Sequence, residues 1–565
     1  MIDKRTMVKG AMILTVANVT TRVIGMFFRI PLARILGEEG MGLFSVAYQI
    51  YTFMFIIVAT GFPIAISKMV AETNAKSSDG DAANARRVFQ TAAFLLGFIG
   101  MLGSAVLFFF AAPLATFFGA PAAQYGIMAI SPAVFFISLV SAHRGYFQGH
   151  QNMLPTAVSE VTEAIFRLSV GIFMASFVMG LYYVDIANFI SRFIPNIQAT
   201  ETVQRDLASA GALLGGPIGM ILVLMILMTV YSFTRKKRMK PIAPLRSRFG
   251  ITKELVLIAV PITIGAAVMS LTGLIDLFTV MNRLQVNPEV FSVYPAVTEG
   301  AAFAGYYGAE LYQRQASALY GMFAGFAHPM FNIPMTFVVA ISVTIVPAIA
   351  ASLESGKTER AREIVHTAIR IVLLMALPAA IGMSLLAEPI LILVFNNANA
   401  APLLQILAIS VIFVALVHVT NAMLQAYGKV KIPVYTMLAG GAAKLAINYF
   451  LIPIWGIDAA PVSTLVCHTI IMILNLTFLS KHVKLSFNVA KNFISPVLSA
   501  VIMGVCALFA HGFLEQVIPG RLATVATIGI AGIIYVLLIF ITRAVEREDL
   551  EMLPFGKRIA AKIYR

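Results

Sequence analysis

The chain has 565 residues, of which 59% are hydrophobic and only 12% are charged, and its mean hydropathy is +0.88. Soluble globular proteins carry about 25% charged residues, so this composition excludes that class and indicates a protein that crosses a bilayer many times. The net charge of +15 alone suits a nucleic-acid binder, but its distribution along the chain argues against nucleic acid as a partner.

Fourteen apolar stretches are long enough to cross about 30 Å of hydrocarbon, and we expect each to be a transmembrane helix of an all-α fold. They run approximately over residues 10–33, 42–69, 88–112, 125–147, 156–180, 209–233, 254–282, 317–351, 361–385, 402–427, 433–455, 459–480, 492–511 and 520–543. Most of the 41 lysines and arginines lie in segments that face the cytoplasm if the N-terminus is inside. The positive-inside rule therefore predicts that both termini are cytoplasmic.

The first stretch carries two arginines, Arg22 and Arg29, each of which costs about 2.5–3.5 kcal/mol to insert. With Asn18 and Gly25 they recur at helical spacing on one stripe, which places the two guanidinium groups about 10 Å apart along the axis. The stripe predicts a cationic face that lines a polar cavity. This stretch is also too long, and too charged, for a cleavable signal peptide.

Charged residues recur in spans five and seven. Glu163 and Arg167 are spaced i, i+4 with the acid first, which favours an ion pair within the helix; direct contact with a substrate is the alternative. Asp276 in span seven has no basic residue within one helical turn. A buried carboxylate needs a partner, and we expect Asp276 to meet Arg22 or Arg29 from across the cavity.

Two further polar residues lie in spans of the second half. His328 stands between Gly325 and Pro329, so it either faces the cavity where the helix unwinds or bonds a freed backbone carbonyl. Lys444 corresponds within one residue to Arg167 in the first half. It either lines the same cavity from the other side or extends toward a membrane interface.

An internal repeat relates spans one to six to spans seven to twelve. ARRVFQTA at 85–92 and AREIVHTA at 361–368 are 276 residues apart, and Ala-Ile-Ser at 129–131 and 408–410 is 279 apart. Because six is even, the two halves have the same orientation, as in parallel-repeat transporters. The predicted organisation is an N-terminal six-helix lobe (1–233), a basic linker (234–253) and a C-terminal six-helix lobe (254–480). Helices thirteen and fourteen (481–543) and a cytoplasmic amphipathic tail (544–565) follow.

The motifs of soluble chemistry are incomplete. ESGKT at 354–358 lacks the first glycine of a phosphate-binding loop, and His143 and His150 have no further metal ligand beside them. We therefore expect no cofactor and no metal. Any energy comes from the membrane potential, a monovalent cation or a substrate gradient.

The chain resembles the multidrug/oligosaccharidyl-lipid/polysaccharide flippase superfamily, and within it the Gram-positive lipid II flippases of the stage V sporulation protein B type. The strings that carry the resemblance are TRVIGMFFRIPLARILG at 21–37, GFPIAISKMVAE at 61–72 and YFQG at 146–149. The second arginine is shifted by one residue from the family pattern, and span two lacks the mid-span arginine of the Gram-negative branch. Arg167 and Lys444 are the candidate substitutes.

The resemblance implies export of an undecaprenyl-pyrophosphate-linked cell-wall precursor, lipid II, across the bacterial cell membrane by alternating access. It implies a cationic cavity for the head group and a groove by spans thirteen and fourteen for the prenyl tail, with cell-wall synthesis proteins as possible partners. Three alternatives stay open: a flippase for another lipid-linked oligosaccharide, a cation-coupled multidrug exporter, and a membrane-embedded glycosyltransferase. The arginines argue against a drug cation, and the scattered acids of the external segments argue against an enzyme.

Overall fold

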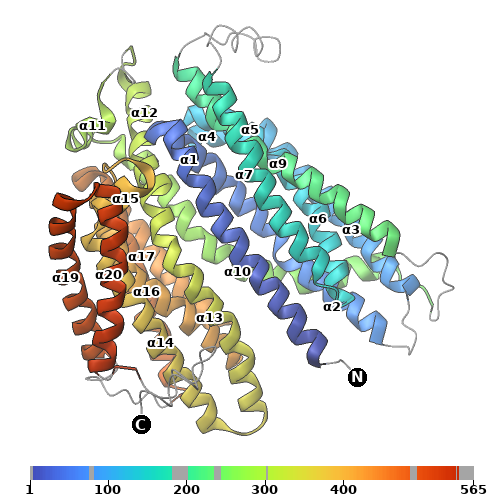
Figure 1. Ribbon diagram of the computed structural model, residues 1–565. Helices are drawn as coiled ribbons and strands as arrows, with labels where there is room; N and C mark the ends of the chain where they lie inside the picture. The colour runs from blue at the N-terminus through green and yellow to red at the C-terminus, as the bar shows by residue number, and fades with distance from the viewer. Residues whose placement is uncertain are drawn as a thin grey trace. The chain divides into compact units, whose positions relative to one another are not determined.

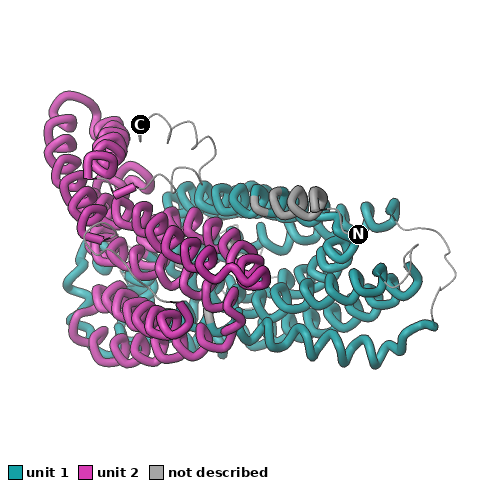
Figure 2. The backbone as a smooth tube through the Cα atoms, turned by 90° about the horizontal axis from the view of Figure 1, so that it is seen from below, with its two compact units in different colours: residues 1–321 teal, residues 322–565 magenta. Residues whose placement is uncertain are grey.

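The computed structural model describes residues 4–75, 82–180, 201–234, 244–300, 303, 305–483, 493–542 and 544–545. These residues form helices and turns without any β-strand (Figure 1). The chain forms two compact units, unit 1 at residues 1–321 and unit 2 at residues 322–565 (Figure 2). The expectation of an all-α fold is therefore confirmed.

The helices of unit 1 include six long ones. They are α1 (Lys4–Ala59), α2 (Gly61–Ala75), α3 (Ala82–Phe109), α4 (Ala111–Phe117), α5 (Gln124–Ile130), α6 (Pro132–Gly149), α7 (Leu154–Gly180), α9 (Glu201–Thr234), α10 (Arg248–Leu284), α11 (Pro295–Thr298) and α12 (Gly308–Gly321), with 3₁₀ turns at Pro121–Ala123 and Pro288–Val293.

Unit 2 begins with a π-helical segment, Met322–Ala327, that continues α12. Its helices are α13 (His328–Glu354), α14 (Thr358–Leu385), α15 (Ala387–Phe395), α16 (Ala401–Ala426), α17 (Lys431–Trp455), α18 (Ala459–Ser480), α19 (Ser495–Val517) and α20 (Gly520–Ile541), with a 3₁₀ turn at Gly456–Asp458.

The predicted spans correspond closely to these helices. Among the described residues, 12 helical stretches are long and apolar enough to cross a membrane, and two of them, Val16–Ala75 and Lys431–Ser480, each contain two predicted spans. Spans one and two run together because α1 continues through Gly37, its one non-helical residue, with φ 65° and ψ −170°. Glycine adopts this left-handed φ without strain, so the break falls at the predicted junction.

The helix bounds also confirm the repeat. α3 and α14 begin 276 residues apart, as do the short helices α4 and α15 that follow them, and α7 and α17 begin 277 residues apart. The offsets of the similar strings therefore describe a repeated order of helices.

The compact units divide the chain at a different place from the linker at 234–253. α10 belongs to unit 1, where it packs against α1, α2 and α3. The packing is close, since a Cβ on Gly61 would lie 2.3 Å from the Ala259 carbonyl oxygen. The predicted domain division describes the repeat and stays a prediction, and most of the tail predicted at 544–565 lies outside the described residues.

Candidate functional site

The arginine stripe of α1 changes in burial along the helix. Asn18 and Arg22 are exposed, whereas Arg29, two turns further on, is half-buried. Arg29 interacts electrostatically with Tyr48 on the second half of α1, with Arg167 on α7 and with Tyr320 on α12. The structure therefore brings Arg29 and Arg167, two of the predicted site residues, to the same place.

Arg167 is held by an aromatic wall. Its Nη1 donates to the Tyr48 hydroxyl at 3.4 Å, and the Tyr48 ring stacks on Phe44 with 5.7 Å between centroids. The cavity that Arg167 lines has a volume of about 10 Å³, close to the minimum that holds one water molecule. Arg167 is therefore positioned by packing.

Asp276 lies on α10 and is 6% exposed. Tyr320 interacts electrostatically with both Asp276 and Arg29, so both residues lie near this one tyrosine. We call Arg29, Tyr48, Arg167, Asp276 and Tyr320 the Arg29 site. A direct pair between Asp276 and an arginine of α1 stays a prediction.

The direct contact predicted within α7 is not formed, although Glu163 and Arg167 still interact electrostatically. Glu163 accepts a hydrogen bond from Arg144 on α6, with Nη2 to Oε2 at 3.0 Å, and Arg144 Nε also donates to Ser159 Oγ at 2.8 Å. α6 and α7 form an antiparallel hairpin around a short turn, so residues equally far from the turn face each other. That symmetry was readable in the sequence: it places Arg144 opposite Ser159, one helical turn before Glu163.

Lys444 and His328 belong to unit 2. Lys444 is 2% exposed, which is incompatible with extension toward an interface, and it interacts electrostatically with His468 on α18. His468 Nδ1 donates to the Thr464 carbonyl at 2.8 Å, which leaves its Nε2 as an acceptor.

His328 begins α13 directly after the π-helical segment, so the predicted irregularity of this span is real. Its Nδ1 accepts from the Asn332 side-chain amide at 2.9 Å, and its ring lies 5.3 Å from the ring of Phe331.

A buried ionic cluster at one end of unit 1 was not anticipated. Arg314 on α12 donates from Nη1 to Glu39 Oε1 at 2.7 Å and from Nη2 to Asp206 Oδ2 at 3.2 Å. Arg205 lies 3.8 Å from Glu39, and Glu310 lies 3.8 Å from Arg314 at the exposed rim. The sequence had placed Asp206 and Arg314 in external loops, but α9 and α12 extend far enough to bury them. We call these five residues the Arg314 cluster.

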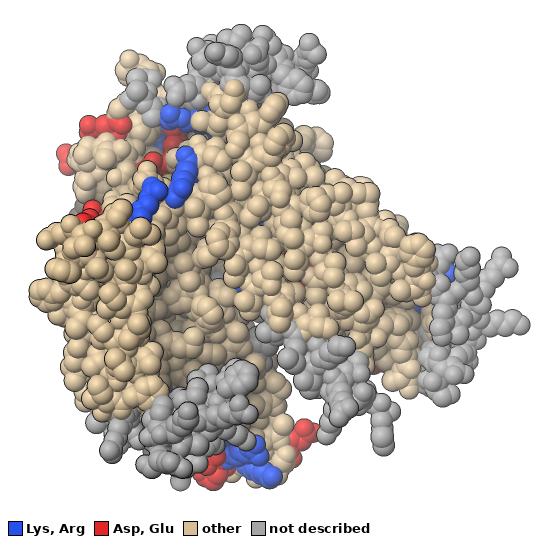
Figure 3. Space-filling model, viewed as in Figure 1, with Lys and Arg blue, Asp and Glu red and all other residues tan. Residues whose placement is uncertain are grey.

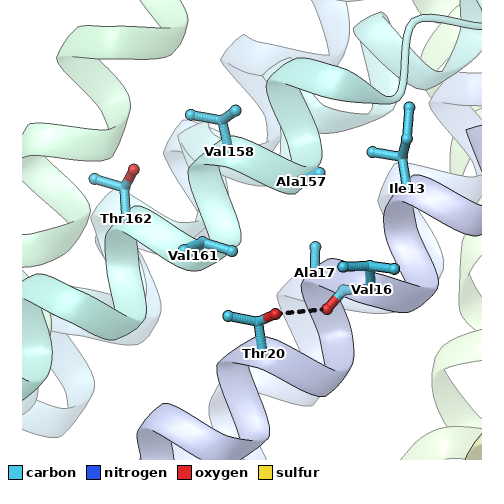
Figure 4. A pocket seen from close by; sticks show the side chains of 8 residues that line it. All are labelled: Ile13, Val16, Ala17, Thr20, Ala157, Val158, Val161 and Thr162. Atoms are coloured by element: carbon cyan, nitrogen blue, oxygen red, sulfur yellow. Dashed lines mark hydrogen bonds between the residues drawn. The ribbon is translucent and has the colours of Figure 1, made fainter.

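An uncharged groove of about 580 Å³ lies between the first part of α1 and the first part of α7 (Figure 4). It is lined by Ile13, Val16, Ala17, Thr20, Ala157, Val158, Val161 and Thr162. The Thr20 hydroxyl donates to the Val16 carbonyl at 2.9 Å, so its hydrogen bond is made within α1. The groove suits hydrocarbon, since no charged side chain lines it.

Charged side chains are segregated along the helices. On the face shown in Figure 3, Lys, Arg, Asp and Glu gather mostly toward the helix ends, and the surface between them is formed by other residues. Among the residues that the structure describes, no three His, Cys, Asp or Glu side chains gather where they could hold a metal ion. The Arg29 site offers guanidinium and hydroxyl groups, which bind charge.

Comparison with known proteins gives consistent matches along the whole chain. A family model described as polysaccharide biosynthesis protein matches residues 7–353, and one described as lipid II flippase MurJ matches residues 325–527. Stage V sporulation protein B of Bacillus subtilis (strain 168) is 25% identical over 98% of this chain and 99% of its own length.

Two solved structures share the fold. A lipid II flippase MurJ in an inward closed conformation superposes with a TM-score of 0.65 at 13% identity, covering 94% of this chain and 98% of that one. An inward-facing multidrug resistance MATE family transporter of the MOP superfamily superposes with a TM-score of 0.59 at 12% identity, covering 82% and 94%.

Proposed function

This chain belongs to the polysaccharide biosynthesis protein family, and we propose that it is a flippase that moves an undecaprenyl-pyrophosphate-linked cell-wall precursor, lipid II, to the outer leaflet. The family model for lipid II flippases over residues 325–527 supports this substrate. The similarity to stage V sporulation protein B, over almost the whole of both chains, supports a role in sporulation.

One observation carries the proposal: Arg29 lies within electrostatic range of Arg167, and both interact with Tyr48, to whose hydroxyl Arg167 Nη1 donates at 3.4 Å. Two guanidinium groups near each other in a low-dielectric interior repel, and an anion between or beside them relieves the repulsion. Pyrophosphate carries at least two negative charges, and guanidinium binds it bidentately. Arg22, exposed two turns away on α1, extends the same cationic surface.

The remaining parts of the substrate follow from the same arrangement. In this proposal the prenyl tail lies against α19 and α20, whose apolar side chains such as Phe509 and Phe513 are exposed. The protein spans the bacterial plasma membrane with both termini in the cytoplasm, as its basic segments favour. Neither ATP nor a metal is required, and the membrane potential or a monovalent cation supplies the energy.

Reconstitution in liposomes tests the function. Lipid II placed in one leaflet is expected to appear chemically unchanged in the other, at a rate that protein-free liposomes do not show. A new glycosidic bond would instead identify a glycosyltransferase. Transport of a cationic dye in place of lipid would identify a drug exporter, and preference for a different lipid-linked oligosaccharide would move the chain to that substrate.

Asp276 gives this mechanism a release step, because its carboxylate shares Tyr320 with Arg29 and competes with the pyrophosphate for the cations. Asp276→Lys adds positive charge beside the Arg29 site and is expected to slow lipid translocation at least about tenfold, the effect of about 1.4 kcal/mol. Glu289→Lys, at an exposed acid of the same unit, is the matched control. Unchanged translocation in the Asp276→Lys variant at equal membrane level would remove Asp276 from the mechanism.

A further inference from the structure

We propose that the Arg314 cluster is a proton-binding site at the outer end of unit 1, and that its protonation releases α12 from α1. The cluster lies apart from the Arg29 site and plays no part in anion binding. Its placement at the outer face rests on the topology in the proposed function, because Gly37 joins spans one and two outside when the N-terminus is inside. The binding of a proton rests on the cluster alone.

The cluster is buried and holds three helices together. Side-chain exposure is 9% for Arg314, 5% for Glu39 and 3% for Asp206, whereas Glu310 is 61% exposed. Glu39 comes from α1, Asp206 and Arg205 from α9, and Arg314 from α12. Arg314 also lies over the Tyr306 ring, 4.5 Å from its centroid. A single guanidinium group therefore ties α12 to both α1 and α9.

The charges of the cluster do not balance. Two buried carboxylates, those of Glu39 and Asp206, share one buried guanidinium group, that of Arg314, whereas Arg205 and Glu310 lie at the rim with 25% and 61% exposure. Glu39 Oε2 is buried and accepts no hydrogen bond, although Glu39 lines an adjoining cavity of about 310 Å³. Excess negative charge in a buried site favours the uptake of a proton by one carboxylate of the group.

The surroundings add further acid. The other titratable and charged groups near the cluster, counted over the described residues of every element packed there, are Arg34 and Glu38 on α1, Glu299 before α12, Tyr125 on α5, and Tyr312 and Tyr320 on α12. Together with the cluster they make five carboxylates against three arginines. The sign of the imbalance is therefore the same in the wider neighbourhood.

α12 is seated on α1 at backbone contact. A Cβ on Gly42 would lie 1.8 Å from the Ser317 carbonyl oxygen, and one on Gly321 would lie 1.9 Å from the Glu38 carbonyl oxygen. Directly after Gly321 the chain enters the π-helical segment, and unit 1 ends there. π-helical turns are irregularities that often mark functional sites.

A proton on Glu39 or Asp206 removes one of the two charges that Arg314 bonds. The tie then loses a charge-assisted hydrogen bond, which is about twice as strong as a neutral one. A low pH on the outer side therefore favours release of α12 from α1. A neutral or high pH there favours α12 packed against α1. An inward proton gradient would thus promote opening toward the outside.

The test is a cysteine-accessibility measurement on the full chain in detergent, without lipid substrate. Cys467 and Cys506 are replaced by serine, and Ser317→Cys places a thiol on α12 where it packs against α1, at a position that is 2% exposed. Ser292→Cys, exposed on the 3₁₀ turn 288–293, is the reference, because its labelling by a maleimide carries the intrinsic pH dependence of the thiol.

The ratio of Ser317→Cys to Ser292→Cys labelling is expected to rise about 5- to 150-fold, the usual range of coupling, on acidification from about pH 8 to about pH 5. Asp206→Asn and Glu39→Gln should give a high ratio at every pH, whereas Glu289→Gln, an exposed acid of the same unit, should keep the response. A ratio independent of pH in the chain with native Glu39 and Asp206 would overturn the proposal, whatever the variants do.

This result is separable from the proposed function. A pH response without lipid translocation in liposomes would leave the proton site standing and refute the flippase. Translocation without a pH response would do the reverse.

Discussion

Replacing Arg29 with alanine is expected to reduce lipid II translocation by about 10- to 100-fold, because a hydrogen bond to a charged group contributes about 1.5–3 kcal/mol. Arg29 meets Arg167, Tyr48 and Tyr320, so its removal also eliminates the paired cationic character of the site. Arg22→Ala should act in the same direction, since Arg22 lies on the same stripe of α1. The measurement is translocation in liposomes, supported by complementation of a flippase-deficient strain at equal membrane level.

Arg360→Ala is the matched control for these two variants, because Arg360 is an exposed arginine of α14 in unit 2. It removes the same charge from the chain and leaves the Arg29 site intact. Full translocation by both Arg22→Ala and Arg29→Ala would refute a cationic cavity and with it the main support for a pyrophosphate substrate.

Arg144→Ala is expected to cost about 3–5 kcal/mol of unfolding free energy, the usual effect of removing one partner from a buried ion pair. Arg144 and Glu163 are each 11% exposed and 3.0 Å apart, so the truncation leaves the Glu163 carboxylate unpaired between α6 and α7. Glu163→Gln should cost less, because its amide oxygen can still accept from Arg144. Unfolding by titration with sodium dodecyl sulfate measures the difference.

Lys68→Ala provides the contrast. Lys68 and Glu72 also form a pair of a cation and a carboxylate, but their side chains are 59% and 45% exposed. Exposed pairs contribute about 0–1 kcal/mol, so this variant should unfold close to the unaltered chain. Equal losses in Arg144→Ala and Lys68→Ala would show that the α6–α7 pair does not stabilise the hairpin.

Several properties of this protein follow from the sequence alone. Hydropathy and length identify the spans because a segment in lipid must satisfy its backbone within one helix, which leaves little structural choice. The repeat is visible because similar strings recur at offsets near 276, and the helix starts of α3 and α14 keep that offset. The intramembrane arginines are conspicuous because their insertion is costly.

The tertiary structure decided which of those charges meet. Glu163 pairs with Arg144 across a hairpin and not with Arg167 one turn away, because the side chain of Arg167 is drawn toward Tyr48. Asp206 and Arg314 resemble loop residues in the chain, yet helices from distant segments bury them together. Helical periodicity determines which face a residue occupies. Only packing between helices determines what that face contacts, and this is the reason that the candidate residues were readable and their partners were not.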